Sequence, residues 1–467
     1  MYVASLAALC AVLIAFTWIG LRARTAGGDL DDYLTARNSQ GASALGLSFL
    51  ASGLGAWILF APPEVGAFVG PLAVAGYAIG AALPFLVFAW CGGAIRRRLP
   101  QGRSIGEFAH ARFGTGVRRW VSLISVLYML CFLTAELTAI GAIAGMLAGL
   151  PPAWPVVGVA VATLVYTTWG GLRASIVTDR WQAWLLIALL VLIGGAVLAR
   201  MPQTAQPLVW PSAPTGVAWS VALTLVIAVT AANLFHQGYW QRVWAARDMR
   251  SLNAGAALGA LTTVAAVGLV GVFGMIAAAT GADMGQPPAP FFALLRGAAP
   301  WVTVVTLVLA VALVASSVDT LQNGIASLMV GEGVTRTLSG ARWITVLLML
   351  PVIGVALQGL SVLRLFLIAD LLCATAVVPV LLGLWGRASA TAAIAGAVAG
   401  LVGAVLPGWV STGSLTAGAL AATFPGSIPT LAPFAGALVA STAVSVAVAL
   451  IWPRPQAGHE ADAGARS

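Results

Sequence analysis

The sequence predicts an all-α integral membrane protein with about thirteen transmembrane helices. Of its 467 residues, 60% are hydrophobic and only 8% are charged, and the mean hydropathy is +0.98. A water-soluble domain of this length needs far more charge to cover its surface. Apolar runs of roughly 20 residues recur from end to end, and each can cross about 30 Å of hydrocarbon. Such runs form helices in lipid, because every backbone N–H and C=O needs a partner within its own segment.

The apolar runs divide the chain into thirteen segments. They are expected near residues 3–21, 44–66, 72–94, 119–148, 154–170, 176–199, 217–239, 253–279, 300–329, 341–358, 362–384, 390–407 and 432–452. Residues 1–453 therefore form a single transmembrane domain, followed by a short polar cytoplasmic tail at 454–467. The stretch 408–431 is rich in Gly, Ser, Thr and Pro, and is expected to be a loop or a re-entrant piece.

Arginine placement predicts the orientation of these segments. If the N-terminus lies outside, twenty arginines fall in inner loops and only Arg200, Arg296 and Arg364 fall outside. Positive charge concentrates on the cytoplasmic side of membrane proteins. We therefore attribute the net charge of +9 to topology in a cell (inner) membrane, with the C-terminus in the cytoplasm, and not to nucleic-acid binding.

Two of the segments contain features that interrupt a helix. Gly53 and Gly55 lie within the segment 44–66, and a proline pair follows at Pro62; glycine lowers helix propensity, and proline ends or kinks a helix. The segment 217–239 ends in ANLFHQGYW, which places amide and imidazole groups at membrane depth. Glycine and proline also serve helix packing in membranes. The interruptions nevertheless favour a transport site, because broken helices mark such sites at the membrane midplane.

The spacing of the two interruptions predicts an inverted repeat. They lie five helices apart, and a unit with five crossings has its second copy inverted in the membrane. We expect repeat one at 44–199 and repeat two at 217–384, with the helix at 3–21 before them. Two extra helices follow, at 390–407 and 432–452.

One face of the segment 300–329 is polar. Its side chains follow i, i+3, i+4, i+7 and i+11 spacing: Ser316, Asp319, Thr320, Asn323 and Ser327. A stripe of this kind is too costly to face lipid, so it faces the bundle or a wet cavity.

Two adjacent serine hydroxyls on this helix, one of them in the stripe, are candidate Na⁺ ligands. Na⁺ is a hard cation and takes oxygen ligands, as such metals do generally. Ser316, Ser317, the carbonyl of Leu313 one turn earlier, and carbonyls freed where the segment 44–66 unwinds supply such oxygens. The alternative is that the hydroxyls bond back to their own helix.

Three further ionisable groups at membrane depth have open interpretations. Asp319 is ion-linked, a proton carrier or a hydrogen-bond centre. Glu136, in LTAELTAIG, lines a substrate path or pairs within the bundle. His236 is a buried core histidine or a ligand.

Two acidic residues have neighbouring arginines. Asp179 precedes Arg180, and an interfacial ion pair is one explanation for it. Asp370 follows Arg364 in the same segment, and the two are expected to neutralise each other.

No motif of hydrolytic or redox chemistry stands out. The chain has no Gly-rich phosphate loop with a following lysine, no HExxH and no CxxC. We therefore expect no enzymatic activity, no cofactor apart from a coupling ion, and no obligate protein partner.

Five stretches, spread over about residues 29–385, resemble the sodium:solute symporter family. In chain order they are DLDDYLTARNS, SIGEFAHARFG, YTTWGGLRASIVTDRWQ, FHQGYWQRVWAARD and VASSVDTLQNG. The third resembles the most specific signature of the family, Y-x-x-x-G-G-[LM] followed by T-D-x-x-Q. The family includes proline, pantothenate, sugar and urea carriers, and it has a leucine-transporter-like inverted-repeat fold.

The resemblance implies a shared sodium site and a set of substrate contacts. The sodium ligands would be carbonyls and hydroxyls of Ala51, Leu54, Leu313, Ser316 and Ser317. Asp179 matches a residue on the inner sodium exit route. The substrate candidates, by position alone, are Trp57, Glu136, Asn233, His236 and Gln237. Gly53 departs from the acidic residue of some amino-acid carriers, which argues against a proline-type contact there.

The expected function is secondary active transport by alternating access, in which Na⁺ and a small polar organic solute move together across the lipid bilayer. The first alternative is a proton-coupled symporter of the same fold, with Asp319 as the carrier. The second is a symporter-like ligand sensor, but family sensors carry a fused kinase region and the tail after Pro453 is too short for one.

Overall fold

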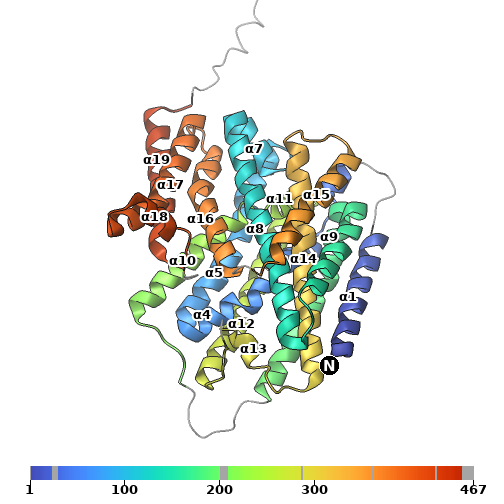
Figure 1. Cartoon of the computed structure of the whole chain (residues 1–467). Coiled ribbons are helices and arrows are strands. Elements are labelled where there is room, and N and C mark those ends of the chain that lie inside the picture. Colours follow the sequence, from blue (N-terminus) through green and yellow to red (C-terminus); the bar gives the residue numbers. More distant parts are fainter. Residues whose placement is uncertain are drawn as a thin grey trace, which may run out of the picture.

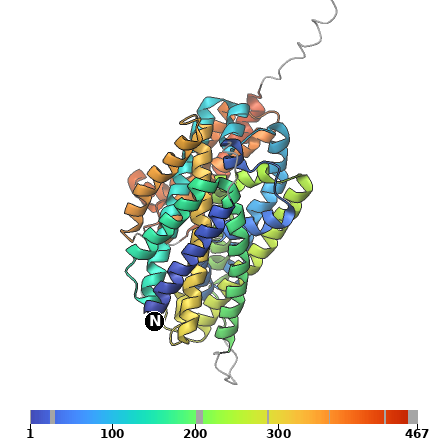
Figure 2. The same cartoon turned by 90° about the vertical axis from the view of Figure 1, so that its right-hand side faces the viewer.

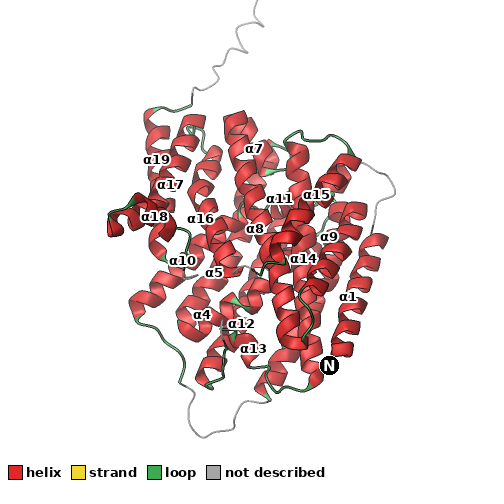
Figure 3. Cartoon of the chain, viewed as in Figure 1, coloured by secondary structure: helices red, strands yellow, loops and turns green. Residues whose placement is uncertain are grey.

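The computed structural model describes residues 2–23, 30–199, 209–285, 288–359, 362–425 and 429–454. These residues form a bundle of helices without a sheet (Figure 3). The all-α prediction is therefore confirmed. Of the expected tail 454–467, only Arg454 lies among the described residues, and Arg24, Arg200 and Arg466 lie outside them.

The elements are named in chain order as in Figure 1. They are α1 (Tyr2–Arg22), α2 (Leu30–Thr35), α3 (Ala42–Gly53), η1 (Ala56–Leu59), α4 (Ala61–Phe68), α5 (Pro71–Val87), η2 (Phe88–Gly92), α6 (Gly93–Arg98), α7 (Ile105–Phe113), α8 (Thr115–Ala148), α9 (Ala153–Leu198), α10 (Thr215–Asn233), α11 (Gln237–Ala245), α12 (Met249–Ala279), α13 (Pro290–Ala293), α14 (Pro300–Gly331), α15 (Leu338–Ala356), α16 (Val362–Leu381), η3 (Leu382–Leu384), α17 (Ala390–Thr412), α18 (Leu415–Ala421) and α19 (Leu431–Ile451).

Within the described residues, eleven helices are long and apolar enough to cross a membrane, or twelve if the bent pair 42–53 and 56–68 counts as one span. This is fewer than thirteen, because the segments expected at 154–170 and 176–199 run together as α9, a helix of 46 residues. A straight helix of that length spans about 69 Å, roughly twice the hydrocarbon thickness. The two expected segments meet near Gly171, whose φ of 58° and ψ of −146° are not helical.

Contacts with α14 show that α9 turns back at Gly171. Tyr166 and Ser175 both donate hydrogen bonds to the carboxylate of Asp319, at 2.6 and 2.7 Å. In a straight helix these two residues would be about 13.5 Å apart along the axis. Glycine permits the turn, since a Cβ on Gly171 would lie 2.3 Å from the carbonyl oxygen of Tyr33.

The bundle places the N-terminus and the end of α19 at opposite ends (Figure 1). Helix α1 packs on α9 and α14 at the outside of the bundle (Figure 2). Helices α17 and α19 pack on each other and on α16 at another side. Small residues allow this close packing, since a Cβ on Gly403 would lie 2.2 Å from the carbonyl oxygen of Gly436.

The stretch 408–431 is partly helical. Helix α17 continues past its expected end at residue 407, with Pro407 inside it, and stops at Thr412. The short helix α18 then covers Leu415–Ala421. The extension is explained by the membrane setting, in which neighbouring groups tolerate a helix proline.

Arginine side chains connect the segments between helices at the end of the molecule where α7 lies. Asp31 accepts hydrogen bonds from Arg37 and Arg103 at 2.9 and 2.8 Å. Burial raises the pKa of Asp31, but these two guanidinium groups outweigh it and hold the pKa at about 2. Arg112 of α7 donates to the carbonyl oxygen of Gly383 at 2.7 Å. This end is the one predicted to be cytoplasmic.

Gly171→Ala tests the reversal of α9. The added methyl group meets the Tyr33 carbonyl in a backbone conformation that alanine disfavours, so the free energy of unfolding should fall by about 1–3 kcal/mol. Gly195→Ala is the matched control, because Gly195 is a helical glycine of α9 with open space around it. Thermal unfolding in detergent measures both variants. Equal unfolding midpoints for the two variants would show that residue 171 does not need to be glycine.

Candidate functional site

The chain from Ala42 to Phe68 consists of two helical pieces that meet at an angle of 62°. Helix α3 ends at Gly53, and Leu54 and Gly55 are extended before η1 begins. A break of this kind separates backbone groups from their helical partners. The expected interruption of this segment is therefore present, at Leu54 and Gly55.

Glu136 of α8 binds the backbone at this break. Its Oε2 accepts a hydrogen bond from the N–H of Ala56 at 2.7 Å, and the residue is 1% exposed. A Cβ on Gly55 would lie 1.9 Å from Oε1, so the close approach of the carboxylate requires glycine. A negative group is favourable at the start of a helix. Of the two interpretations of Glu136, the structure supports pairing within the bundle.

A second break separates α10 from α11. Helix α10 ends at Asn233, and tight turns lead to Gln237, where α11 begins. Between them, the ring of His236 stacks on Tyr239 with centroids 4.3 Å apart. Both ring nitrogens of His236 are buried without a hydrogen-bond partner in the described part of the chain. The expected interruption of the segment 217–239 is thus also present.

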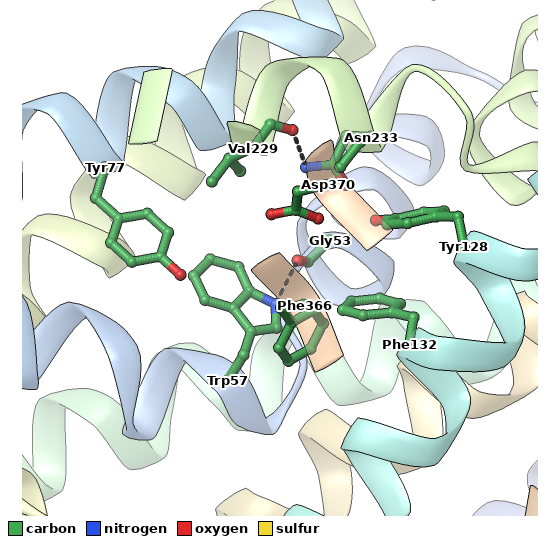
Figure 4. A pocket seen from close by; sticks show the side chains of 10 residues that line it. Gly53, Trp57, Tyr77, Tyr128, Phe132, Val229, Asn233, Phe366 and Asp370 are labelled. Carbon is green, nitrogen blue, oxygen red and sulfur yellow. Dashed lines mark hydrogen bonds between the residues drawn. The ribbon is translucent and has the colours of Figure 1, made fainter. Parts of the chain in front are cut away.

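A cavity lies beside the two breaks (Figure 4). Its walls come from α3, η1, α5, α8, α10 and α16. The lining residues are Gly53, Trp57, Tyr77, Tyr128, Phe132, Val229, Ala232, Asn233, Phe366 and Asp370.

Two of the five predicted substrate contacts, Trp57 and Asn233, line this cavity, and the other three do not. Glu136 binds the break, and His236 packs on Tyr239. Gln237 instead holds the linker before α7, because its Nε2 donates to the carbonyl oxygen of Arg103 at 2.6 Å. The substrate contacts themselves stay predictions.

Most of the aromatic lining was not predicted. Tyr77, Tyr128, Phe132 and Phe366 occur in apolar helices, where an aromatic residue usually belongs to the core. Their shared position beside Trp57 depends on how the helices pack, which the sequence pattern does not fix.

The expected pairing of Asp370 with Arg364 is wrong. Arg364 donates to the carbonyl oxygen of Thr423 at 3.1 Å. Asp370, six residues further along α16, lines the cavity instead. Positions six apart lie on different sides of a helix, which explains why the two side chains diverge.

The adjacent serines of α14 are both fully buried. Ser316 Oγ donates a hydrogen bond to Asp179 Oδ1 at 2.6 Å, so its own lone pairs stay available. Ser317 Oγ has no hydrogen-bond partner within the described ranges. A buried hydroxyl without a partner costs about 1–3 kcal/mol. An oxygen-ligated cation at this position fits that unsatisfied atom.

The carbonyl groups of the expected sodium site lie at the break and on α14. Ala51 is in the last turn of α3, and Leu54 follows its end; the last carbonyls of a helix lack intrahelical partners. Helix α14 contacts both α3 and η1. Leu313 lies in the buried part of α14, one turn before Ser317.

Asp179 does not form the expected interfacial pair with Arg180. It is fully buried, and its Oδ2 accepts hydrogen bonds from Ser48 at 2.5 Å and from Arg242 Nη2 at 2.7 Å. Arg242 is equally buried, and its Nη2 also donates to Thr320 Oγ1 at 3.0 Å. The network therefore joins α3, α9, α11 and α14 around one internal ion pair.

Asp319 is surrounded by hydroxyl donors. It accepts hydrogen bonds from Tyr166, Ser175 and Thr178 at 2.6, 2.7 and 3.2 Å. All five residues of the polar stripe on α14 are buried, so the stripe faces the bundle interior, as the spacing predicts. Of the three interpretations of Asp319, this geometry favours a hydrogen-bond centre.

Arg242→Gln tests the internal ion pair. Loss of the guanidinium group leaves Asp179 as an unpaired buried charge, so the free energy of unfolding should fall by about 3–5 kcal/mol. Arg247→Gln is the control, since the Arg247 side chain is 68% exposed, and exposed pairs contribute about 0–1 kcal/mol.

The double variant Arg242→Gln with Asp179→Asn isolates the charge itself. It should be more stable than Arg242→Gln alone, because no unpaired charge stays buried. Thermal unfolding in detergent of the wild type, the single variants Arg242→Gln and Asp179→Asn, and the double variant measures the coupling. If the losses in free energy of unfolding of the two single variants simply add up in the double variant, the ion pair does not stabilise this region.

Comparisons with known proteins agree with this geometry. A model of the sodium:solute symporter family matches residues 33–208. The chain is 29% identical over 363 residues to Spermidine transporter DUR31 of Candida albicans, an alignment that covers 76% of this chain and 69% of that protein.

Two solved transporters have similar structures. A Na⁺-coupled sialic acid symporter, in a substrate-bound outward-open state, aligns with a TM-score of 0.78 and 17% identity, over 97% of this chain and 99% of that one. Mhp1, a nucleobase-cation-symport-1 family transporter in a closed conformation, aligns with a TM-score of 0.55 and 14% identity, over 92% of this chain and 96% of that one. The chain is a multi-pass membrane transport protein with a leucine-transporter-like fold, and the resemblance of its sequence to the sodium:solute symporter family is confirmed.

Proposed function

We propose that the chain couples the movement of Na⁺ to the uptake of a small polar organic solute by alternating access. The observation that carries this proposal is the position of the break in the first repeat. Gly53 and Trp57 line the cavity, and Ala51 and Leu54 provide carbonyl groups beside α14. One short stretch of chain therefore contributes to a solute site and to an ion site.

In this proposal Na⁺ binds the hydroxyl groups of Ser316 and Ser317 and the carbonyls of Ala51, Leu54 and Leu313. The ion gives Ser317 Oγ the partner that it lacks, and it fixes α3 against α14. A fixed break favours the outward-open state and shapes the cavity for the solute. A ligand shifts a conformational equilibrium only by its difference in affinity for the two states. Loosening of the break on inward opening would weaken both sites together.

Asp179 would act on the inner exit route of the ion. It already accepts a hydrogen bond from Ser316, and Arg242 balances its charge. A departing Na⁺ would exchange the hydroxyl oxygen of Ser316 for a carboxylate oxygen of Asp179, which then lies between Na⁺ and Arg242. We place the N-terminus outside and the C-terminus in the cytoplasm of a cell (inner) membrane, in line with the arginine distribution.

The solute is best identified by a screen of amino acids, urea, sugars, carboxylates and amines. Amines belong in it because one relative is named a spermidine transporter. Uptake into proteoliposomes with and without a Na⁺ gradient separates coupled transport from passive leak. Uptake that follows pH and ignores Na⁺ would instead select proton coupling.

Ser317→Ala tests the ion site. The variant removes one Na⁺ ligand but no protein hydrogen bond, so half-maximal uptake should need about tenfold more Na⁺. The double variant with Ser316→Ala should need more again. Ser125→Ala is the control, because Ser125 is another buried serine whose hydroxyl lacks a partner in the described structure, but it lies on α8. Unchanged Na⁺ dependence in the double variant would refute the site.

A further inference from the structure

One carboxylate in the cavity has no cationic partner. Asp370 is 8% exposed, and it takes part in none of the ion pairs formed by the described residues. Figure 4 shows its oxygens inside the ring of lining side chains. A buried carboxylate is costly unless a positive group or several donors compensate it. An occupant with a positive group would compensate this cost and favour the ionised carboxylate.

Aromatic rings form the walls around this carboxylate. Trp57 stacks on Tyr77 with ring centroids 5.3 Å apart and planes 14° apart. Tyr128 stacks on Phe132 with centroids 5.7 Å apart, and Phe366 meets Phe132 edge-on at 4.9 Å. The face of an aromatic ring attracts a cation within about 6 Å of its centroid, most strongly where water is excluded. The aromatic rings and the carboxylate of Asp370 therefore both favour a positively charged occupant.

Two of the N–H donors at the cavity are already engaged, while the hydroxyls of Tyr77 and Tyr128 can both donate and accept. Asn233 Nδ2 already donates to the carbonyl oxygen of Val229 at 2.8 Å, and Trp57 Nε1 donates to that of Gly53 at 3.3 Å. No arginine is among the lining residues, and the chain contains no lysine. A carboxylate or phosphate solute would meet an uncompensated negative charge here. A solute with N–H donors and a positive charge meets complementary groups.

We propose that the solute is an organic cation, with its ammonium group at Asp370 and its carbon chain between the Trp57–Tyr77 and Tyr128–Phe132 pairs. The inference rests on the proposed function, because it names the substrate class of the same cavity. It assigns recognition of charge to Asp370 and recognition of the alkyl chain to the rings. Na⁺ and the solute then bind at separate sites, and the break between α3 and η1 contributes residues to both sites.

The test uses the full-length chain in proteoliposomes with an inward Na⁺ gradient. Labelled putrescine, spermidine and choline are the probes, and 1,4-butanediol is the neutral match of putrescine in length. Each probe that is transported should be displaced by the other amines but not by the diol. Asp370→Asn should raise the KM for the transported amine by about tenfold or more, and Asp370→Glu should preserve most of the affinity. Asp283→Asn, an exposed acidic residue outside the cavity, should leave uptake unchanged.

The identity of the transported solute tests this inference, and the Na⁺ dependence of uptake tests the proposed function. If a sugar, urea or carboxylate is taken up with Na⁺ and no amine competes, the cation inference fails while Na⁺ coupling stands. If no solute responds to Na⁺, the proposed function fails. Thermal unfolding is also measured with and without Na⁺. If Na⁺ raises the unfolding temperature of the wild type but not that of Asp370→Asn, Asp370 belongs to the ion site and the inference is overturned. Should that variant not fold, competition between putrescine and 1,4-butanediol on the wild-type chain decides.

Discussion

Backbone groups inside a bilayer need partners, and the break at Leu54 and Gly55 is where this constraint is hardest to meet. The structure satisfies one side of the break with the carboxylate of Glu136, which accepts from Ala56, and it leaves room for that carboxylate by placing glycine at residue 55. The other side of the break is the end of α3, and α3 contacts α14, whose Ser317 hydroxyl has no partner in the described part of the chain. In the proposed function a cation completes the oxygen ligands between these two helices, and this links the fold to cation-coupled transport.

Two of the buried carboxylates near the break, Asp179 and Asp370, have different partners. The pair of Asp179 and Arg242 connects four helices through serine and threonine hydroxyls, so that movement of α3 must also change the environment of that pair. Asp370 stands apart from it, within an aromatic cavity and without a partner cation. Asp179 is thus balanced by the protein, and in our proposal Asp370 is balanced by the solute. This division explains how a single chain could bind two cations of different size without having them compete for one site.

The hydrophobic pattern was sufficient to predict the fold class, because helices in lipid have no alternative and their length is set by the membrane. The first break was also predictable, since Gly53 and Gly55 act through local backbone preferences. The second was indicated by the amide and imidazole groups that ANLFHQGYW places at membrane depth. The two segments on either side of Gly171 were predicted separately, whereas the structure joins them as the single helix α9 across that non-helical residue, which is why the count of spans differs. The partners of Asp179 and Asp370 were not predictable, because they come from helices distant in sequence whose rotation is set by packing. Neighbouring arginines in the sequence, Arg180 and Arg364, were misleading for the same reason.

Backbone hydrogen exchange with and without Na⁺ tests the central claim most directly. It reports on the amides of residues 51–57 and 313–317, whose protection depends on whether an ion holds the break against α14. Na⁺ should slow exchange in both stretches at once, and K⁺ at the same ionic strength should not. Equal exchange in the two salts, or protection confined to α17 and α19, would contradict a sodium site at this break.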